Sequence, residues 1–432
     1  MPSTNIGFRG DAIVVLNESF AVKETVMSEA IEAVNQPNLW RLETPGHLGW
    51  KRTAWPDDPN KYLMISADSH CNEPSNLWYE RIDREFRDRL PRIEIDENGV
   101  KWQVSEGWQR SRLLDSALEG EDRVRSKAGA DPEERLKDMA RDGVDAEIIF
   151  PNKGLMMWAT PDARFAAAQC RVYNDWAWET FGPYNDRMSP MAAIATADLE
   201  IAIAEIKRVA KMGFRGLTLP CKPIFGPHDA RHPNYNLPMF DPMWAAIQDA
   251  GLPITFHVST GRDPRAARKD GGAVINYVSH SLVPTIEPVA HMCASGVLER
   301  FPELRFAAIE SGIGWVPWAL EAMDEAYRKH HMWAFPKLKK LPSEYFHEHG
   351  FASFQEDRVG LDLAVKYGLV DNFLWANDYP HHEGSWPHSA EAIERQMGGI
   401  ADEQRAKILG LNAARLFKFD VDALLRRRAT VN

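Results

Sequence analysis

Short apolar runs alternate with longer amphipathic segments through most of the chain, and this alternation predicts a parallel β-sheet with a helix between successive strands. The candidate strands are residues 62–67, 145–150, 191–195, 216–219, 252–257, 304–310, 351–354 and 373–378. Eight strands are the number that closes a (β/α)8 barrel. We therefore predict an α/β fold of the TIM-barrel class.

Helix ends are marked by residues that begin or stop helices. Pro161 is expected at the first helical position of one helix, and Asp198 is expected to cap another that ends at Gly213. Asp241-Pro242 is expected to open a helix that Gly251 ends. Further helices are predicted over residues 315–327 and 402–417.

The chain divides into a predicted arm, a barrel and a tail. Residues 1–60 contain a helical patch at 22–33 and a stretch rich in Pro, Trp and Gly, which indicates an N-terminal arm or lid. Residues 61–420 form the barrel, and the polar segment 75–141 is predicted as an insertion after the first strand, where barrel enzymes carry substrate-covering loops. Residues 421–432 form a tail, in which Arg426 to Arg428 are expected to be a solvated last helical turn.

Composition and charge narrow the function classes. The 432 residues, of which 44% are hydrophobic, suffice for one large core. A net charge of −11 argues against nucleic acid as a partner, because phosphate binding needs a concentrated basic face. No apolar stretch approaches a membrane span or an export signal, so we expect no membrane partner. The four cysteines lie far apart without a C-x-x-C pair, which favours a reducing cytoplasm. A small-molecule substrate and a homodimer are the expected partners.

Metal-binding side chains stand where several predicted strands end. Asp68 and His70 follow the first strand, and the D-x-H spacing aims both into one space because alternate strand residues share a face. His257, Glu310 and Asp378 end three later strands. Taken singly, each has an ordinary explanation as a turn residue, a core histidine or a capping carboxylate. Together they form a shell of nitrogen and oxygen donors, which suits Zn, Mn or Fe.

Several motifs carry a resemblance to a known family. The chain resembles the amidohydrolase-related, aminocarboxymuconate-semialdehyde decarboxylase-like branch of the amidohydrolase superfamily over roughly residues 60–420. The motifs are Asp68-Ser69-His70, Glu73-Pro74, His257, residues 296–304 (GVLERFPEL), residues 310–315 (ESGIGW), residues 377–381 (NDYPH) and residues 412–416 (NAARL). Together they are specific for the family but not for a reaction.

The resemblance implies roles for individual residues. Asp68 and His70 stand where many members have the two histidines of H-x-H, and His257 matches the histidine of strand five. Asp378 matches the strand-eight aspartate, a metal ligand that is often the base. Glu310 stands where members often have a histidine on strand six. The two carboxylates at histidine positions make the shell harder, which favours Mn(II) or Fe(II) over zinc.

Further residues are candidates for the same site. If His280 and His381 also face the mouth of the barrel, a dinuclear centre bridged by a carboxylate is expected, so the metal count is one or two ions. Arg262, in the loop after His257, is a candidate to bind a substrate carboxylate, with a solvated loop arginine as the alternative. Lys222, where some superfamily members have a carboxylated lysine, is expected at the surface or facing substrate. His291 and His382 are expected to be exposed or capping.

Three functional hypotheses follow. The leading one is a metal-dependent hydrolase or decarboxylase of a small aromatic or unsaturated carboxylic acid, with Asp378 taking the proton. The second is a dinuclear non-haem Fe or Mn/Fe monooxygenase that uses O2. The third is a non-catalytic barrel that serves as a partner subunit.

Overall fold

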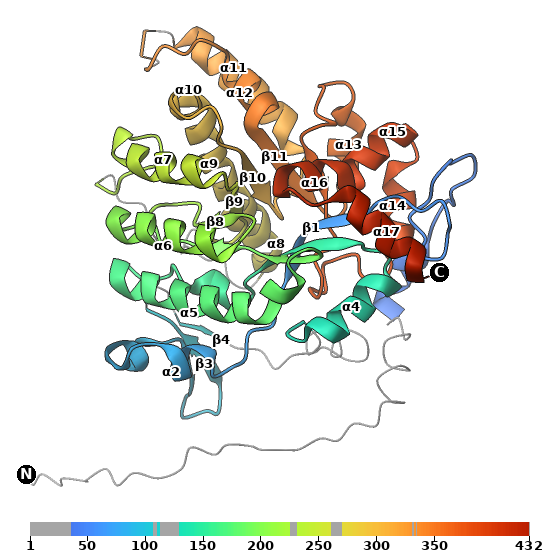
Figure 1. Cartoon of the computed structure of the whole chain (residues 1–432). Helices are drawn as coiled ribbons and strands as arrows, with labels where there is room; N and C mark the ends of the chain where they lie inside the picture. The colour runs from blue at the N-terminus through green and yellow to red at the C-terminus, as the bar shows by residue number, and fades with distance from the viewer. Residues whose placement is uncertain are drawn as a thin grey trace, which may run out of the picture.

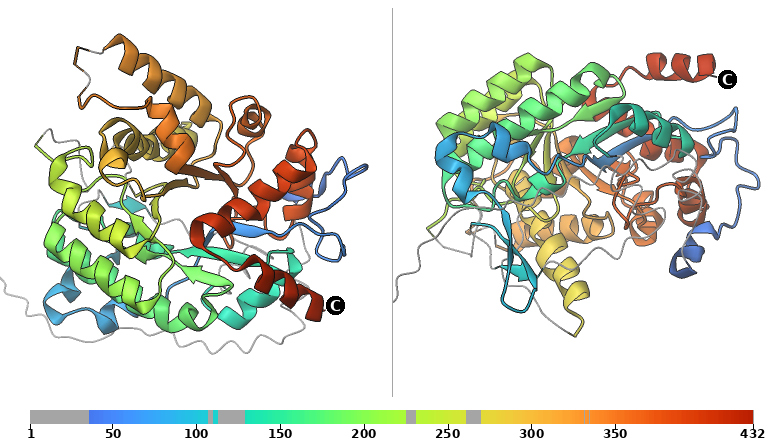
Figure 2. Two further views of the ribbon diagram at one scale, coloured as in Figure 1. Left: turned by 45° about the horizontal axis from the view of Figure 1, so that its top comes forward. Right: turned by 90° about the horizontal axis from the view of Figure 1, so that it is seen from below.

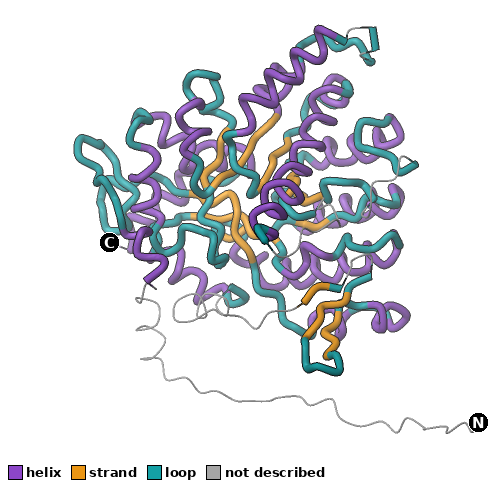
Figure 3. Tube along the Cα trace, turned by 180° about the vertical axis from the view of Figure 1, so that it is seen from behind, coloured by secondary structure: helices purple, strands orange, loops and turns teal. Residues whose placement is uncertain are grey.

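The computed structural model of the chain describes residues 36–106, 110–112, 129–224, 231–260, 270–330, 332–333 and 335–431. Short strands occupy the centre of the molecule, and helices surround them (Figure 1; Figure 3). This arrangement confirms the predicted α/β architecture. The helical patch expected at residues 22–33 lies outside the described residues.

The barrel strands run parallel to one another in two hydrogen-bonded rows. One row has the order β1-β5-β6, and the other has the order β12-β11-β10-β9-β8-β7. The strands are β1 (Ile65–His70), β5 (Ala146–Phe150), β6 (Met188–Pro190), β7 (Ala192–Ala193), β8 (Leu217–Leu219), β9 (Ile254–His257), β10 (Phe306–Ile309), β11 (Gly350–Phe354) and β12 (Phe373–Trp375). Each predicted run overlaps a strand. The run at 191–195 contains β7 and begins at Met191, the residue that separates β7 from β6.

Hydrogen bonds join the ends of these rows. Met191 N donates to Ile149 O at 2.9 Å and so links the break between β6 and β7 to β5. At the other end, His70 N donates to Tyr379 O at 2.6 Å, and Asp378 N donates to Asp68 O at 3.1 Å. The first strand therefore lies beside the segment that follows the last strand, which brings Asp68 and Asp378 together across 310 positions of chain.

Helices cover the outside of the strands, and their ends follow local side-chain chemistry. Asp198 Oδ1 accepts from the backbone N–H groups of Glu200 and Ile201, and Gly213 ends that helix at φ 107°. Asp162, rather than Pro161, begins α5: its side chain accepts from Arg164 N and Phe165 N, so Pro161 lies before the helix. The longer helices are α4 (Pro132–Arg141), α5 (Ala163–Phe181), α6 (Leu199–Met212), α7 (Asp241–Ala250), α9 (Val283–Ala294), α11 (Trp315–Lys329), α12 (Pro342–His349), α13 (Arg358–Ala364), α14 (Ser389–Met397) and α17 (Val421–Val431). The predicted helix over 402–417 is α15 (Asp402–Ala406), the π-helical η7 (Lys407–Leu411) and α16 (Asn412–Phe417) in succession.

The polar segment after β1 forms its own small layer. It contains α2 (Leu77–Arg81), the 3-10 helix η2 (Arg84–Arg89) and an antiparallel sheet of β2 (Arg92–Ile95), β3 (Lys101–Val104) and β4 (Ser111–Arg112). This sheet projects from the helical body (Figure 2). The segment then ends in α4, which lies between β1 and β5 as an ordinary barrel helix.

The tail helix α17 is more firmly attached than the sequence indicates. Arg428 donates to the carboxylate of Asp145 and to the carbonyl oxygens of Lys61 and Tyr62. Its side chain is 20% exposed. The expectation of a solvated basic turn is therefore wrong for Arg428, because the guanidinium binds the chain just before β1. No described helix has the length and apolar character needed to span a membrane.

Candidate functional site

The strand β1 carries the first two site residues on one face. Asp68 and His70 are separated by one residue, and both are fully buried. Ser69, between them, faces the neighbouring strand, where its Oγ donates to Ile148 O at 2.8 Å. The alternation of a β-strand therefore aims the carboxylate and the imidazole into the same space, as the D-x-H spacing predicts.

Three more side chains arrive at this space from other strands. His257 is the last residue of β9, Glu310 directly follows β10, and Asp378 follows β12 by three residues. Glu310 and Asp378 both adopt left-handed backbone conformations, with φ of 56° and 54°. Such conformations are costly for residues with a Cβ and persist where surrounding structure holds them, often at functional sites. Two carboxylates are thus held at strained strand ends.

The two strand histidines each have one ring nitrogen occupied. Nδ1 of His70 lies 2.9 Å from Pro151 O, and Nδ1 of His257 lies 2.9 Å from Val258 O. A carbonyl accepts only, so each Nδ1 carries the proton and each Nε2 presents a lone pair. This is the usual arrangement of a metal-binding histidine, whose other nitrogen donates to a carbonyl or carboxylate.

The free nitrogen and oxygen atoms of these residues cluster around a common point. His70 Nε2 lies 3.6 Å from Asp68 Oδ1, and His257 Nε2 lies 3.4 Å from Asp68 Oδ1 and 3.5 Å from Glu310 Oε2. Both oxygens of Asp68 and both Nε2 atoms are buried without a hydrogen-bond partner in the described part of the chain. Two ligand atoms of one ion, each bound at about 2.1 Å, are separated by roughly 3.0 to 3.4 Å. The spacing and the missing partners therefore fit a divalent cation.

A second group of donors overlaps the first. Four ligand atoms, from His70, Glu310, Asp378 and His381, lie within 4.8 Å of one another, as do those of Asp68, His70, His257 and Glu310. Asp378 Oδ1 is 3.4 Å from His70 Nε2 and 3.1 Å from His381 Nδ1. Both Asp378 oxygens and His381 Nδ1 also lack hydrogen-bond partners among the described residues. His381 stacks on His70 with ring centroids 3.9 Å apart.

The electrostatics of this cluster reflect crowding of buried charge. Burial raises the pKa of Glu310 well above its usual range, and the nearby carboxylates of Asp378 and Asp68 raise it further. Burial would also raise the pKa of Asp378, but the neighbouring His381 and His70 outweigh it and hold the pKa below the usual range. Burial lowers the pKa of His70, with His381 adding to the effect. The buried carboxylates of Asp68, Glu310 and Asp378 repel one another when all three are ionised, and a bound cation would offset that repulsion.

Other predicted residues fall outside the two groups. His280 lies on η6 (Asn276–Leu282), a π-helical segment, and belongs to neither group. Lys222 is half-buried in the bend that follows β8. His291 Nε2 lies 3.9 Å from Glu287, and His382 pairs with Glu383 and is 71% exposed. Arg262 lies outside the described residues.

Sequence reasoning missed Tyr277, which lies one turn before His280. Burial of its hydroxyl, together with the carboxylates of Glu310, Glu383, Asp378 and Asp68, raises the pKa of Tyr277 to about 12. The phenol therefore lies in the electric field of the site, although nearly half of the side chain is exposed. His280 was predicted only from its place between two predicted strands, and no pattern in the sequence singled out Tyr277.

Arg135 was also missed, because it lies in the polar stretch that was taken for an insertion. It is fully buried on α4 and pairs with Glu147. Its Nη1 donates to His70 O at 2.6 Å, and its Nη2 donates to Ser69 Oγ at 2.8 Å. The guanidinium also lies 4.8 Å from the ring centroid of Tyr379. The sequence signal was Asp131-Pro132, a cap and first-turn proline that mark a helix start.

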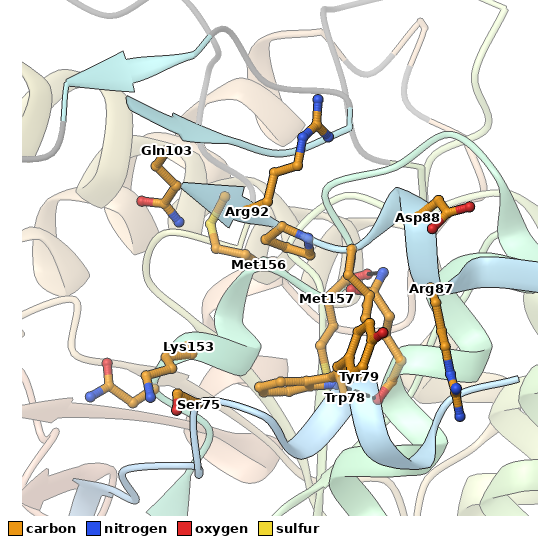
Figure 4. Close-up of a pocket in the computed structure, with 14 residues that line it drawn as sticks. Ser75, Trp78, Tyr79, Arg87, Asp88, Arg92, Gln103, Lys153, Met156 and Met157 are labelled. Atoms are coloured by element: carbon orange, nitrogen blue, oxygen red, sulfur yellow. Dashed lines mark hydrogen bonds between the residues drawn. The ribbon is translucent and has the colours of Figure 1, made fainter. Parts of the chain in front are cut away.

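A cavity of about 650 Å³ lies beside the site, between the small layer after β1 and the loop after β5. Asn152 lines this cavity, and its Oδ1 lies 3.4 Å from His381 Nε2. Trp78 and Tyr79 form the middle of its wall, while Lys153 and Ser75 lie at one end (Figure 4). One side chain, Asn152, therefore contacts a candidate metal ligand and also borders the cavity.

The chain is similar to several known proteins. A family model described as amidohydrolase matches residues 67–419. Gamma-resorcylate decarboxylase from a Rhizobium species is 26% identical over 307 residues, covering 66% of this chain and 86% of that protein. An amidohydrolase structure from Mycobacterium avium subsp. paratuberculosis superposes with a TM-score of 0.65 at 18% identity, covering 84% of this chain and 99% of the other. A dihydroxybenzoic acid decarboxylase from a Polaromonas species, crystallised with manganese and 2-nitroresorcinol, gives a TM-score of 0.58 at 20% identity, covering 84% and 99%.

Proposed function

The chain belongs to the amidohydrolase family, and on this premise we propose that it is a metal-dependent decarboxylase of aromatic or unsaturated carboxylic acids. The observation that carries the proposal is the buried group of Asp68, His70, His257 and Glu310, whose ligand atoms lie within 4.8 Å of one another. The curated relatives are named gamma-resorcylate decarboxylase, which favours decarboxylation over hydrolysis.

Asp68, His70, His257, Glu310 and Asp378 are the residues that would hold the cation. When bound, the cation supplies a Lewis acid that binds oxygen atoms of the substrate and stabilises developing negative charge. The carbonyl oxygens of Pro151 and Val258 fix the two strand imidazoles in the orientation that presents Nε2. The oxygen-rich donor set suits Mn(II) or Fe(II), and the related Polaromonas enzyme was crystallised with manganese.

We assign the proton transfer to Asp378. In decarboxylation, the bond between the ring carbon and the carboxylate breaks, CO2 leaves, and the electron pair remains on the ring carbon. A proton must then bind that carbon. The carboxylate of Asp378 is fully buried at the mouth, and His381 Nδ1 lies 3.1 Å from its Oδ1. Asp378 is thus placed to take up a proton and deliver it to the ring carbon, with His381 holding its orientation. We propose that His257 is a ligand of the cation. Arg262 is our candidate to bind a substrate carboxylate.

The direct test is CO2 release by metal-loaded and metal-free protein. The Mn2+-loaded protein is assayed with 2,6-dihydroxybenzoate and related hydroxybenzoates, and the metal-free protein should have no activity until Mn2+ is restored. Asp378→Asn should lower kcat by about three orders of magnitude or more while Mn2+ is still bound. Asp362→Asn, at an exposed position on α13, is the matched control and should leave kcat unchanged. Full activity of the chelated protein would overturn the proposal.

The alternatives make different predictions. An O2-dependent monooxygenase would require oxygen for product formation and would carry iron or manganese in a redox role, and the names of the relatives give it no support. A non-catalytic partner subunit would need no metal shell, and the buried donors count against it.

We also propose that the protein is a homodimer and that it is cytoplasmic. The exposed aromatic side chains of Trp318, Trp333 and Phe335, which are 67%, 72% and 75% exposed, support a homodimer. Light scattering during gel filtration would show a mass near 98 kDa for a dimer, twice the 49.0 kDa chain. All four cysteines are free and buried, which is in keeping with the proposed cytoplasmic location.

A further inference from the structure

We propose that Arg41 is a positioning residue for the proton transfer, because it holds the loop that places His381 beside Asp378. Arg41 lies in residues 36–60, which we call the arm, and the arm precedes residues 67–419, the part of the chain that matches the family model. The contact therefore joins a segment outside the family match to the site. This inference rests on the proposed function, since it adds a residue to the same proton transfer.

The loop from Asp378 to Ser385 is closed at its base and folded into turns along its length. Ser385 N donates to Asn377 O at 2.9 Å, which ties the two ends of the loop together. Within the loop, His381 N donates to Asp378 O at 2.9 Å, and Gly384 N donates to His381 O at 3.1 Å. His381 lies where these two turns meet, so its position depends on how the outer part of the loop is held.

Arg41 holds that outer part of the loop from the arm. Its Nη1 donates to the carbonyl oxygen of Gly384, and its Nη2 donates to the carbonyl oxygen of His382. Two nitrogens of one planar guanidinium thus bind two carbonyl groups that lie directly after His381. Because the guanidinium is a rigid fork, it fixes the spacing and the direction of both acceptors, which a lysine ammonium does not. Arg41 therefore restricts the backbone that carries the His381 ring.

The arm is fixed to α14, which gives Arg41 a firm base. Arg395 Nη1 donates to the carbonyl oxygen of Arg41 at 2.6 Å and to that of Glu43 at 2.8 Å. The neighbouring Glu394 is 1% exposed, and its carboxylate accepts from Trp55 Nε1 at 2.7 Å. Release of the arm would deprive this buried carboxylate of a donor, which is costly. The arm accordingly lies against α14 (Figure 1).

The ring of His381 makes contacts that depend closely on the loop position. Its Nδ1 lies 3.1 Å from Asp378 Oδ1, its Nε2 lies 3.4 Å from Asn152 Oδ1, and its ring stacks on that of His70 with centroids 3.9 Å apart. A displacement of about 1 Å in such an arrangement costs roughly 100-fold in rate. The substrate cavity is lined by other residues. We therefore expect the loss of the Arg41 contact to lower kcat and to leave KM nearly unchanged.

The test measures kcat and KM with 2,6-dihydroxybenzoate, and backbone hydrogen exchange over residues 378–388, in the Mn2+-loaded full chain. Arg41→Met should lower kcat about 10- to 100-fold, with KM within about threefold of the wild type. Exchange of the His381 and Gly384 amides should become faster in this variant. Arg41→Lys should give intermediate values, because it keeps the charge without the fork. The melting temperature should fall by less than about 3 °C in both, which separates positioning from a general loss of stability.

Arg395 provides an independent test of the same contact. It binds the backbone of the arm and the carboxylate of Glu356, so its influence on the loop passes through Arg41. Arg395→Met should lower kcat about fivefold or more. The double variant Arg41→Met/Arg395→Met should have the kcat of Arg41→Met alone, because the effects of two residues in one chain of contacts do not add.

Arg52→Met is the matched control. Arg52 is also an arginine of the arm, but it pairs with Asp402, with Nη2 2.5 Å from Oδ2, and its loss should leave kcat and loop exchange unchanged. An equal loss of kcat in Arg52→Met, or losses that multiply in the double variant, would overturn the proposal. Unchanged loop exchange in Arg41→Met would also overturn it. Faster loop exchange in Arg41→Met, in a protein whose wild type releases no CO2, would support the contact and count against the proposed reaction alone.

Discussion

Replacing Arg135 should separate the stability of the barrel from the geometry of its metal site. The guanidinium is fully buried, pairs with Glu147, and donates to the backbone oxygens of His70 and Gly129. Arg135→Met removes the charge and leaves Glu147, which is 1% exposed, without its cationic partner. The second oxygen of Glu147 already has no hydrogen-bond partner among the described residues, so no other donor replaces the guanidinium.

The expected loss is large. Removing one partner of a buried ion pair costs about 3 to 5 kcal/mol, because the other charge stays buried and unpaired. For a chain of 432 residues, that loss lowers the melting temperature by roughly 3 to 6 °C. The double variant Arg135→Met/Glu147→Leu leaves no buried charge, so it should recover about 2 kcal/mol or more of the loss. Metal affinity should stay about 10- to 100-fold weaker in both variants, because the support of the His70 backbone and of Ser69 is missing in each.

Thermal and urea unfolding of the metal-free proteins measure the stability, and Mn2+ titration measures the affinity. Arg135→Lys is the matched control, since it keeps a positive charge but has no planar fork, and it should fall between the wild type and Arg135→Met in both assays. The reasoning is refuted if Arg135→Met unfolds within 1 kcal/mol of the wild type, or if the double variant regains metal affinity together with stability.

Two further predictions concern the glycine beside Asp378 and the lysine before β1. Gly384→Ala should abolish tight Mn2+ binding, because its Cβ would lie 2.3 Å from Asn377 O and 2.9 Å from Asp378 O; Gly398→Ala, where nothing lies within 4 Å, is the control in the same titration. Burial lowers the pKa of Lys61 to about 8, below its unfolded value of 10.5, so the unfolded state holds more protons between these values and stability should rise with pH. Relative to Lys61→Met, the free energy of unfolding of the wild type, measured in urea, should increase by about 2 to 3 kcal/mol between pH 7 and pH 10. A decrease over that window would contradict the lowered pKa of Lys61.

The sequence was sufficient for the fold because the barrel depends on short-range signals. Apolar runs followed by helix caps such as Asp198 and stops such as Gly213 predict each strand and helix locally, and parallel pairing follows from their alternation. The candidate ligands Asp68, His70, His257 and Asp378 were chosen by the same reasoning, because strand ends share one edge of a parallel sheet, and the structure brings their side chains close together. These side chains lie together only because the first strand hydrogen-bonds to the segment that follows the last strand. No local sequence pattern encodes that contact.

What the sequence did not reveal depends on contacts between distant segments. Arg135 reads as one more charge in a polar stretch, and only the approach of α4 to the end of β1 makes it a buried support of His70. Tyr277 was missed in favour of His280 because both lie on η6, between β9 and β10, and only the folded structure shows that Tyr277 lies near the carboxylates of the site. Arg428 was assigned to solvent because its partner Asp145 lies 283 positions earlier.

The features of the mouth that reduce stability are the strongest argument for a bound cation. Glu310 and Asp378 adopt left-handed backbone conformations that favour glycine, and their carboxylates are buried beside a third, from Asp68. His70 and His257 point unpaired nitrogens at the same space. A core selected only for stability would replace such residues with apolar ones, because each orphaned polar atom is costly. A bound cation explains why these donors lie at one point, because binding the cation offsets the stability that the unpaired polar atoms cost. Mn2+ should therefore raise the melting temperature of the wild type, and it should do so less in His257→Ala.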